Sequence, residues 1–181
     1  GAMVVLVSGG IDVSFTAVAA FAMYATTVIL RDLAPDKPWP LAFAIATLIG
    51  AVLGAINGVL IAFFGLPTLI VTLGTLSVFR GFLLTFVGTL QISNLPSGMR
   101  DFSRWMMVRG TNSDGSFYSL PWAFAALVII VVATWFILNR TMLGRAIYAI
   151  GGAPESARRI GIDVRRTQFF IYVFVGALAG L

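Results

Sequence analysis

The sequence contains no cysteine and no histidine in its 181 residues. Disulfides and thiolate chemistry are therefore excluded, as is catalysis by serine–histidine–aspartate or cysteine–histidine groups. Metal sites built on histidine or cysteine ligands are excluded for the same reason. The sequence predicts no cofactor and no metal site.

Lysine is almost absent as well. Lys37 is the only one, and it lies among prolines rather than at the end of a glycine-rich loop. The chain therefore lacks the loop that cradles nucleotide phosphates in ATPases. A pair of carboxylates for an intramembrane aspartic protease is also missing, because Asp12 is the only candidate. The sequence predicts that the chain is not an enzyme, and that any ATP hydrolysis takes place on a separate chain.

Charged residues make up 10% of the chain and hydrophobic residues 59%, whereas a soluble domain carries about 25% charged residues. The mean hydropathy is +0.99. The apolar residues form runs of about the 20 residues that a helix needs to cross a bilayer, with incomplete runs at both ends. We therefore expect an all-α, polytopic transmembrane bundle, part of a single domain (1–181). Its four full spans are 13–30, 41–64, 68–90 and 121–138.

The positive charges are concentrated in one place. Residues 140–166 carry six arginines against two acids, 91–120 carry three against two, and 31–40 are balanced. Because cytoplasmic loops are enriched in arginine and lysine, 140–167 is predicted to be a cytoplasmic loop and 91–120 an external loop. The same reasoning places 31–40 outside and 65–67 inside. A net charge of +5 concentrated in this way does not indicate nucleic-acid binding.

Within the arginine-rich loop, residues 154–160 have the chemistry of a short helix. Pro154 suits the first helical position, and Gly161 suits the left-handed conformation that closes a helix. Asp163 suits the N-cap of the helix that follows. A helix of about 10 Å is marginal in water on its own. It is either a solvated loop that fixes the orientation of the chain or a docking helix for a soluble subunit. The charges match the helix dipole: Glu155 at its start, Arg158 and Arg159 at its end.

This loop also resembles a known family. Residues 144–162, from Gly144-Arg145 through Tyr148-Ala149-Ile150-Gly151-Gly152 to Gly161-Ile162, resemble the cytoplasmic loop of the sugar-type permease subunits of bacterial ABC importers (ribose, xylose and arabinose systems). In that family the loop forms a coupling helix that contacts the ATP-binding cassette subunit. Ala153 stands where the family often has asparagine, so a helix cap worth about 1 kcal/mol is missing. The resemblance implies that the ATPase-coupling residues are Gly151, Gly152, Pro154, Glu155, Arg158, Arg159 and Gly161.

Residues 8–14 resemble the Gly-Gly-Ile-Asp-Leu-Ser motif of the same family, with Val13 in place of leucine. Their glycines permit an unwound segment, and an acid at membrane depth is costly. Two interpretations stay open together. Asp12 or Ser14 caps the following helix, or the segment is a broken helix that lines a translocation path. Residues 67–81, which also resemble the family, contain Arg80.

The candidates for the translocation path or its gating are Asp12, Asn57 and Arg80. Asn57 either bonds a neighbouring helix or faces the solute, and the structural role is favoured. Arg80 lies about 18 Å along its span, and either lines the path or bonds carbonyls of a neighbour. A stripe of small residues on the second span predicts close helix packing: Ala42, Ala46, Gly50, Gly54 and Gly58.

The resemblance implies a permease subunit that imports a monosaccharide or similar small polar solute across the bacterial inner membrane by alternating access. Its expected partners are an ATP-binding cassette subunit, a second permease copy or homologue, an external solute-binding protein and the lipid bilayer, but no nucleic acid. We expect the chain to be a central portion of a longer permease. The alternatives are a branched-chain amino-acid permease, an ion- or proton-coupled carrier using Asp12 and Arg80, or a non-transporting membrane scaffold.

Overall fold

A computed structural model describes residues 1–33, 38–86, 100, 102, 105–111 and 117–181. It is 79% helical and contains, in the described part, four helices long and apolar enough to cross a membrane. The predicted all-α, polytopic bundle is therefore confirmed. The four helices are α2 (Phe15–Leu33), α3 (Trp39–Ala62), α4 (Thr68–Phe86) and α6 (Trp122–Arg140).

Four further helices and a hairpin complete the described elements: α1 (Ala2–Val7), β1 (Met106–Thr111), β2 (Phe117–Pro121), α7 (Met142–Gly152), α8 (Pro154–Arg159) and α9 (Val164–Gly180). The strands pair antiparallel, with Val108 opposite Leu120. They belong to the stretch predicted as the external loop, most of whose remainder lies outside the described residues. Their β-branched and aromatic residues favour an extended backbone. Neither α7 nor the hairpin was predicted from the sequence.

Helices α3 and α9 form the closest pair in the bundle. A Cβ added at Gly50 would overlap the carbonyl oxygen of Gly176, and one added at Gly54 would overlap that of Tyr172. A Cβ at Gly58 would lie 3.0 Å from the ring of Phe169. The small residues thus let two backbones approach directly, which is how helices associate where no hydrophobic force drives them together.

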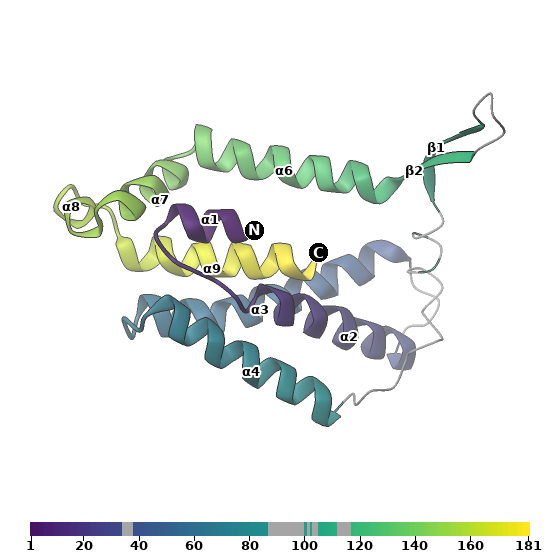
Figure 1. Ribbon diagram of the computed structural model, residues 1–181, viewed down its shortest axis with the longest axis horizontal. Helices are drawn as coiled ribbons and strands as arrows, with labels where there is room; N and C mark the ends of the chain where they lie inside the picture. The colour runs from purple at the N-terminus through teal and green to yellow at the C-terminus, as the bar shows by residue number, and fades with distance from the viewer. Residues whose placement is uncertain (34–37, 87–99, 101, 103–104, 112–116) are drawn as a thin grey trace.

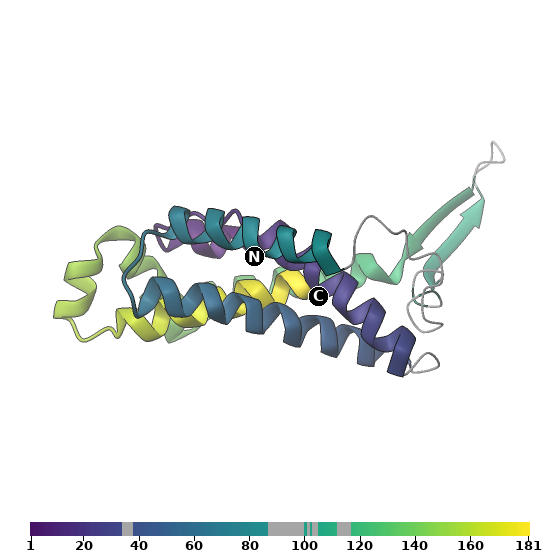
Figure 2. The ribbon, with the colours of Figure 1, turned by 90° about the horizontal axis from the view of Figure 1, so that it is seen from below.

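The two ends of the bundle differ. Figure 1 and Figure 2 show α7, α8 and the turn between α3 and α4 at one end, which we call the loop end. The hairpin, the last turn of α2 and the first turn of α3 lie at the other, the hairpin end; residues 34–37 lie outside the described residues. The chain segments predicted to share a membrane side are thus gathered at the same end of the molecule.

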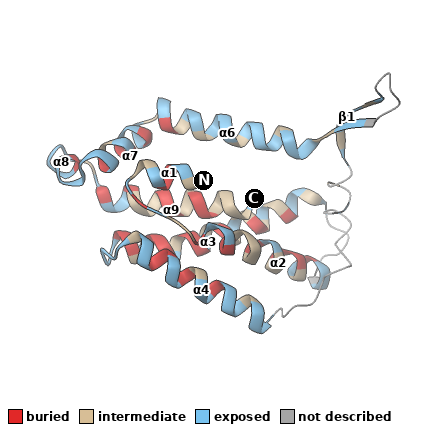
Figure 3. Ribbon diagram, viewed as in Figure 1, coloured by how far each residue is buried: buried red, intermediate tan, exposed pale blue. Residues whose placement is uncertain are grey.

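Helix α6 stands apart from the other spans. Figure 3 shows it exposed along most of its length, and only 6% of its most apolar 18-residue stretch is buried inside the protein. Leu138, near the loop end, is 3% exposed and joins the main core cluster with residues of α1, α3, α4, α7 and α9. An exposed helix this apolar needs lipid or another helix around it.

Candidate functional site

The loop end is built around a sharp corner between α6 and α7. Thr141 caps α7, because its hydroxyl oxygen accepts a hydrogen bond of 3.2 Å from the backbone N–H of Gly144. A side chain on Gly144 would overlap the carbonyl oxygen of Leu138, so the corner requires glycine there. Helix α7 then buries one face, including Ile147 and Ile150, each 1% exposed. The chain enters α8 from this rigid base.

Helix α8 begins where its sequence predicts and ends one residue earlier, at Arg159. Pro154 is its first residue, and the preceding Ala153 is extended and makes no side-chain cap. Gly161 adopts φ +87°. Its N–H donates to the carbonyl of Arg158, and the N–H of Ile162 donates to that of Ala157, both at 3.0 Å. This pair of bonds is the Schellman arrangement that satisfies the free carbonyls at a helix end.

Only one residue of α8 is buried. Ala157 is 2% exposed and packs in a cluster with Ile150 of α7 and Val164 of α9. The remaining side chains are exposed, and Arg158 makes a 3.2 Å ion pair with Glu155 across less than one turn. Ile160, next to them, is 75% exposed. The segment therefore presents charges of both signs beside a large apolar side chain, the composition of a protein-docking surface rather than of a binding pocket.

The field around α8 is positive. All six arginines between 140 and 166 are exposed, and the two acids of this segment each pair with an arginine. Asp163 caps α9 by accepting from the backbone N–H of Arg166 at 3.0 Å, as predicted, and it also pairs with the Arg166 side chain. The remaining positive charge attracts an acidic partner surface and favours placement on the side of a membrane where arginine accumulates.

The second site is a break in the helix between α1 and α2. Gly9 has φ +82° and closes α1, because the N–H of Gly10 donates to the carbonyl of Val5 and that of Gly9 to Leu6, both at 3.0 Å. Figure 1 shows the following residues running from the loop end into the middle of the bundle before α2 begins. The predicted unwound segment is present.

Side chains of α4 satisfy this unwound backbone. The N–H of Ile11 donates to the hydroxyl oxygen of Thr68 at 3.2 Å, and its carbonyl accepts from Thr72 at 3.2 Å. Thr68 and Thr72 are one turn apart, so both hydroxyls meet one residue. Irregular backbone at membrane depth persists only where protein groups satisfy it in this way. The hydroxyl of Thr72 also bonds the carbonyl of Leu69 in its own helix, at 3.4 Å.

Asp12 and Asn57 both form hydrogen bonds with Ser14, just before the start of α2. The carboxylate of Asp12 accepts from the backbone N–H of Ser14 at 2.8 Å and from its hydroxyl at 2.7 Å. The amide of Asn57, 1% exposed, donates to the same hydroxyl at 2.8 Å. Its Oδ1 is buried and has no hydrogen-bond partner among the described residues. Two of the three predicted path residues are thus joined through Ser14, which sequence reasoning treated only as a possible cap.

Arg80 does not join this network. It lies on the exposed face of α4, two turns beyond Thr72 or roughly 12 Å along the axis. No hydrogen bond or ion pair ties it to the described part of the chain. Gly74 and Gly81 share much of that face, and a Cβ added at either would meet nothing within 4 Å. The exposed face of α4 therefore carries Arg80 among large apolar side chains such as Ile70 and Val78, and no described helix covers it.

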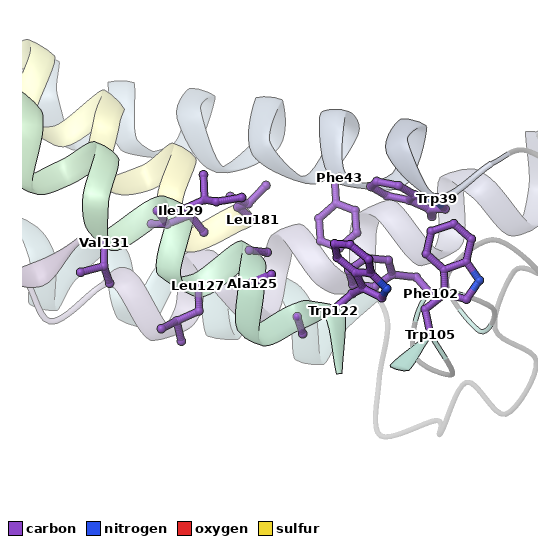
Figure 4. Close-up of a pocket in the computed structure, with 13 residues that line it drawn as sticks. Trp39, Phe43, Phe102, Trp105, Trp122, Ala125, Leu127, Ile129, Val131 and Leu181 are labelled. Atoms are coloured by element: carbon purple, nitrogen blue, oxygen red, sulfur yellow. The ribbon is translucent and has the colours of Figure 1, made fainter. Parts of the chain in front are cut away.

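An apolar cavity of about 740 Å³ lies between α6 and the rest of the bundle. Figure 4 shows rings gathered at its hairpin end and aliphatic side chains along the rest. Phe102 contacts Phe43 and Trp39, with ring centroids 4.9 Å and 5.1 Å apart. Because its lining offers almost no hydrogen-bonding groups, desolvating a polar solute there is costly. None of the predicted path residues lines it.

A family model described as branched-chain amino acid transport system / permease component matches residues 1–181. The autoinducer 2 import system permease protein LsrC of Enterobacter sp. (strain 638) is 33% identical over 179 residues, covering 99% of this chain and 48% of LsrC. LsrD of Photorhabdus temperata is 32% identical over 183 residues, covering 98% and 51%. LsrD of Salmonella typhimurium is 29% identical with the same coverage. The chain spans about half the length of these relatives. No solved structure matches it.

Proposed function

The chain belongs to the family described as branched-chain amino acid transport system / permease component, and from this premise we propose that it is the permease subunit of an ATP-driven importer. Membership confirms the predicted resemblance to ABC importer permeases and does not favour an ion-coupled carrier. The proposed solute is a monosaccharide or a similarly small polar molecule, since the motifs resemble sugar-type permeases and the similar relatives are autoinducer 2 permeases.

The observation that carries the proposal is the surface of α8. Six residues make a helix too short to be stable alone in water, and Ala157 is the only one of them that is buried. Its charged side chains and the exposed Ile160 point away from the protein. We propose that a nucleotide-hydrolysing subunit contacts Glu155, Arg158 and Arg159, with Pro154 and Gly161 setting the length of the helix. Gly151 and Gly152 have no side chain to present to that subunit, and we propose no contact with it for either glycine.

The mechanism proposed for the whole importer is alternating access. The loop end faces the cytoplasm of a bacterial inner membrane, and the hairpin end faces a solute-binding protein outside. Closure of the ATPase subunits on nucleotide displaces α8, and the spans rock to open one side of the path. A second permease copy or homologue completes the path, because the exposed face of α4 that carries Arg80 has no covering helix in the described part of this chain.

Replacing Glu155 and Arg158 together with alanine tests the proposal. In membranes containing the whole importer, we expect the variant to insert normally but to lose coupling between ATP hydrolysis and uptake. The matched control removes another exposed ion pair, Arg31 and Asp32 at the hairpin end, which lie 2.7 Å apart. Full coupled uptake in the α8 variant, or equal loss in the control, would refute the role of α8.

A further inference from the structure

Two adjacent glycines of α7 have different surroundings. A Cβ added at Gly151 would overlap the carbonyl oxygen of Val7 and would lie 3.0 Å from the carbonyl carbon of Val7 and 3.3 Å from that of Ser8. A Cβ added at Gly152 would meet nothing within 4 Å. Both residues are largely exposed, but the side on which a Cβ would project is closed at Gly151 and open at Gly152. The absence of a side chain at Gly151 therefore lets α7 lie directly on the last turn of α1, and no such requirement applies at Gly152.

The contact joins rigid parts on both sides. On the α7 side, Ile147 shares a buried cluster with Val4 and Val5 of α1. On the α1 side, Gly9 closes the helix, and a Cβ built on it would lie 3.7 Å from both the Cα and the carbonyl oxygen of Gly151. Atoms packed this closely cannot slide freely, so a shift of the α7 end is passed to the end of α1.

The chain leads from this contact into the break. After Gly10, the next residue is Ile11, whose backbone is held by Thr68 and Thr72 of α4. Ser14 follows and is bonded by Asn57 of α3. On the opposite side, α8 is tied to α7 through Ala157 and Ile150. A continuous series of packed or hydrogen-bonded groups therefore connects α8 to the polar residues at the start of α2.

We propose that Gly151 is a positioning residue that couples α8 to the broken helix, so that displacement of α8 rearranges residues 8–14. The inference rests on the proposed function, in which a nucleotide-hydrolysing subunit moves α8. It goes further in assigning the step inside the membrane to the contact between Gly151 and Val7. A non-helical segment between two helices is the kind of element that adopts two arrangements, and a proposed route requires such an element.

The test measures directly whether the surroundings of residue 11 change when the ATPase subunit binds nucleotide. The 181 residues have no cysteine, and the side chain of Ile11 is 47% exposed, so Ile11→Cys provides a site for a spin label. The full-length permease would be purified with its ATPase subunit in three forms that carry this label: the parent, Gly151→Ala and Gly152→Ala. The mobility of the label is measured by electron paramagnetic resonance without nucleotide and after trapping with ATP and vanadate.

We expect the ATPase subunit to copurify with all three forms. The label should change its mobility on trapping in the parent and in Gly152→Ala, and that change should be lost in Gly151→Ala. If Gly151→Ala only disrupted the fold, less ATPase subunit would copurify with that variant as well. The inference is overturned if the label in Gly151→Ala responds like the parent, if the label in Gly152→Ala loses its response, or if the label in the parent does not respond. Absence of an ATPase subunit from the parent preparation would instead refute the proposed function, and this inference with it.

A second measurement needs no variant and covers the case in which Gly151→Ala fails to insert. Hydrogen exchange of the parent complex is compared before and after trapping. Residues 8–14 and 142–152 should change their protection together. A change in 142–152 with none in 8–14 would show that α8 moves without the break, which overturns the inference and leaves the proposed function intact.

Discussion

The side-chain amide of Asn57 donates a 2.8 Å hydrogen bond to the hydroxyl of Ser14, although 43 residues separate them in the sequence. Both side chains are enclosed, with exposed fractions of 1% and 0%. The Ser14 hydroxyl in turn donates a hydrogen bond of 2.7 Å to the carboxylate of Asp12, so one hydroxyl joins α3 to the acid that precedes α2. The bond fixes where α2 begins inside the bundle.

Replacing Asn57 with alanine should lower the free energy of unfolding by about 1–2 kcal/mol, because the Ser14 hydroxyl oxygen loses its donor in an enclosed site. Unfolding by SDS in mixed micelles measures the change. Asn139→Ala is the control, since that amide bonds the carbonyl of Trp135 on the exposed surface of its own helix. An equal effect of the two substitutions would contradict the account.

Gly54→Ala should destabilise the bundle by about 1–3 kcal/mol, since the new methyl group would press on the backbone of α9 and force the helices apart. Its Cβ would lie 2.9 Å from the Cα of Gly176, besides the overlap with the carbonyl of Tyr172. Gly74→Ala, with nothing within 4 Å of its Cβ, should be neutral or stabilising. The same SDS titration measures the free energy of unfolding of both variants, and a Gly54→Ala variant as stable as the parent would rule out direct backbone packing.

Thr72→Val should loosen the break while leaving the rest of α4 intact. It keeps the shape of the side chain but removes the donor to the carbonyl of Ile11, at a cost of about 1 kcal/mol. Hydrogen exchange of residues 8–14 should therefore become faster. Thr75→Val is matched to it, because Thr75 bonds Val71 within its own helix, and this variant should leave 8–14 unchanged. Equal exchange in the two variants would show that α4 does not hold the break.

Arg80→Leu should leave the free energy of unfolding within about 0.5 kcal/mol of the parent, because an exposed side chain with no partner in the described residues holds nothing in place. Uptake by the whole importer should nevertheless fall if Arg80 lines the path. Arg31→Ala is the control, an exposed arginine at the hairpin end. Unimpaired uptake in Arg80→Leu would remove it from the candidates.

The sequence was sufficient to predict features that depend on neighbouring residues. Pro154 and Gly161 bound α8 because a missing N–H and a left-handed glycine act within one turn. Asp163 was predicted as the cap of α9 for a similar reason. The four long spans follow from composition alone, and their described ends lie within three residues of the predicted ones. The predicted end of the third span, residue 90, lies outside the described residues.

Features that depend on distant partners were not predicted. The amphipathic pattern of α7, with Ile147 and Ile150 on one face, was overlooked inside a charged loop. Its buried side chains pack on α1, α8 and α9, and no local signal reveals these partners. Gly176 and Gly180 complement the stripe on α3, but that match requires knowing which helices are neighbours. Gly151 and Gly152 are equivalent in the sequence, and only the position of Val7 distinguishes them.

The central claim is that α8 lies at the cytoplasmic surface and is held there by a separate nucleotide-hydrolysing subunit. The most direct measurement places a photo-crosslinker on Ser156→Cys, an exposed position of α8, in membrane vesicles that contain the whole importer. The account predicts a crosslink to the ATPase subunit and labelling of residue 156 from the cytoplasmic side only. Labelling from the external side, or no crosslink in vesicles that hydrolyse ATP during uptake, would contradict it.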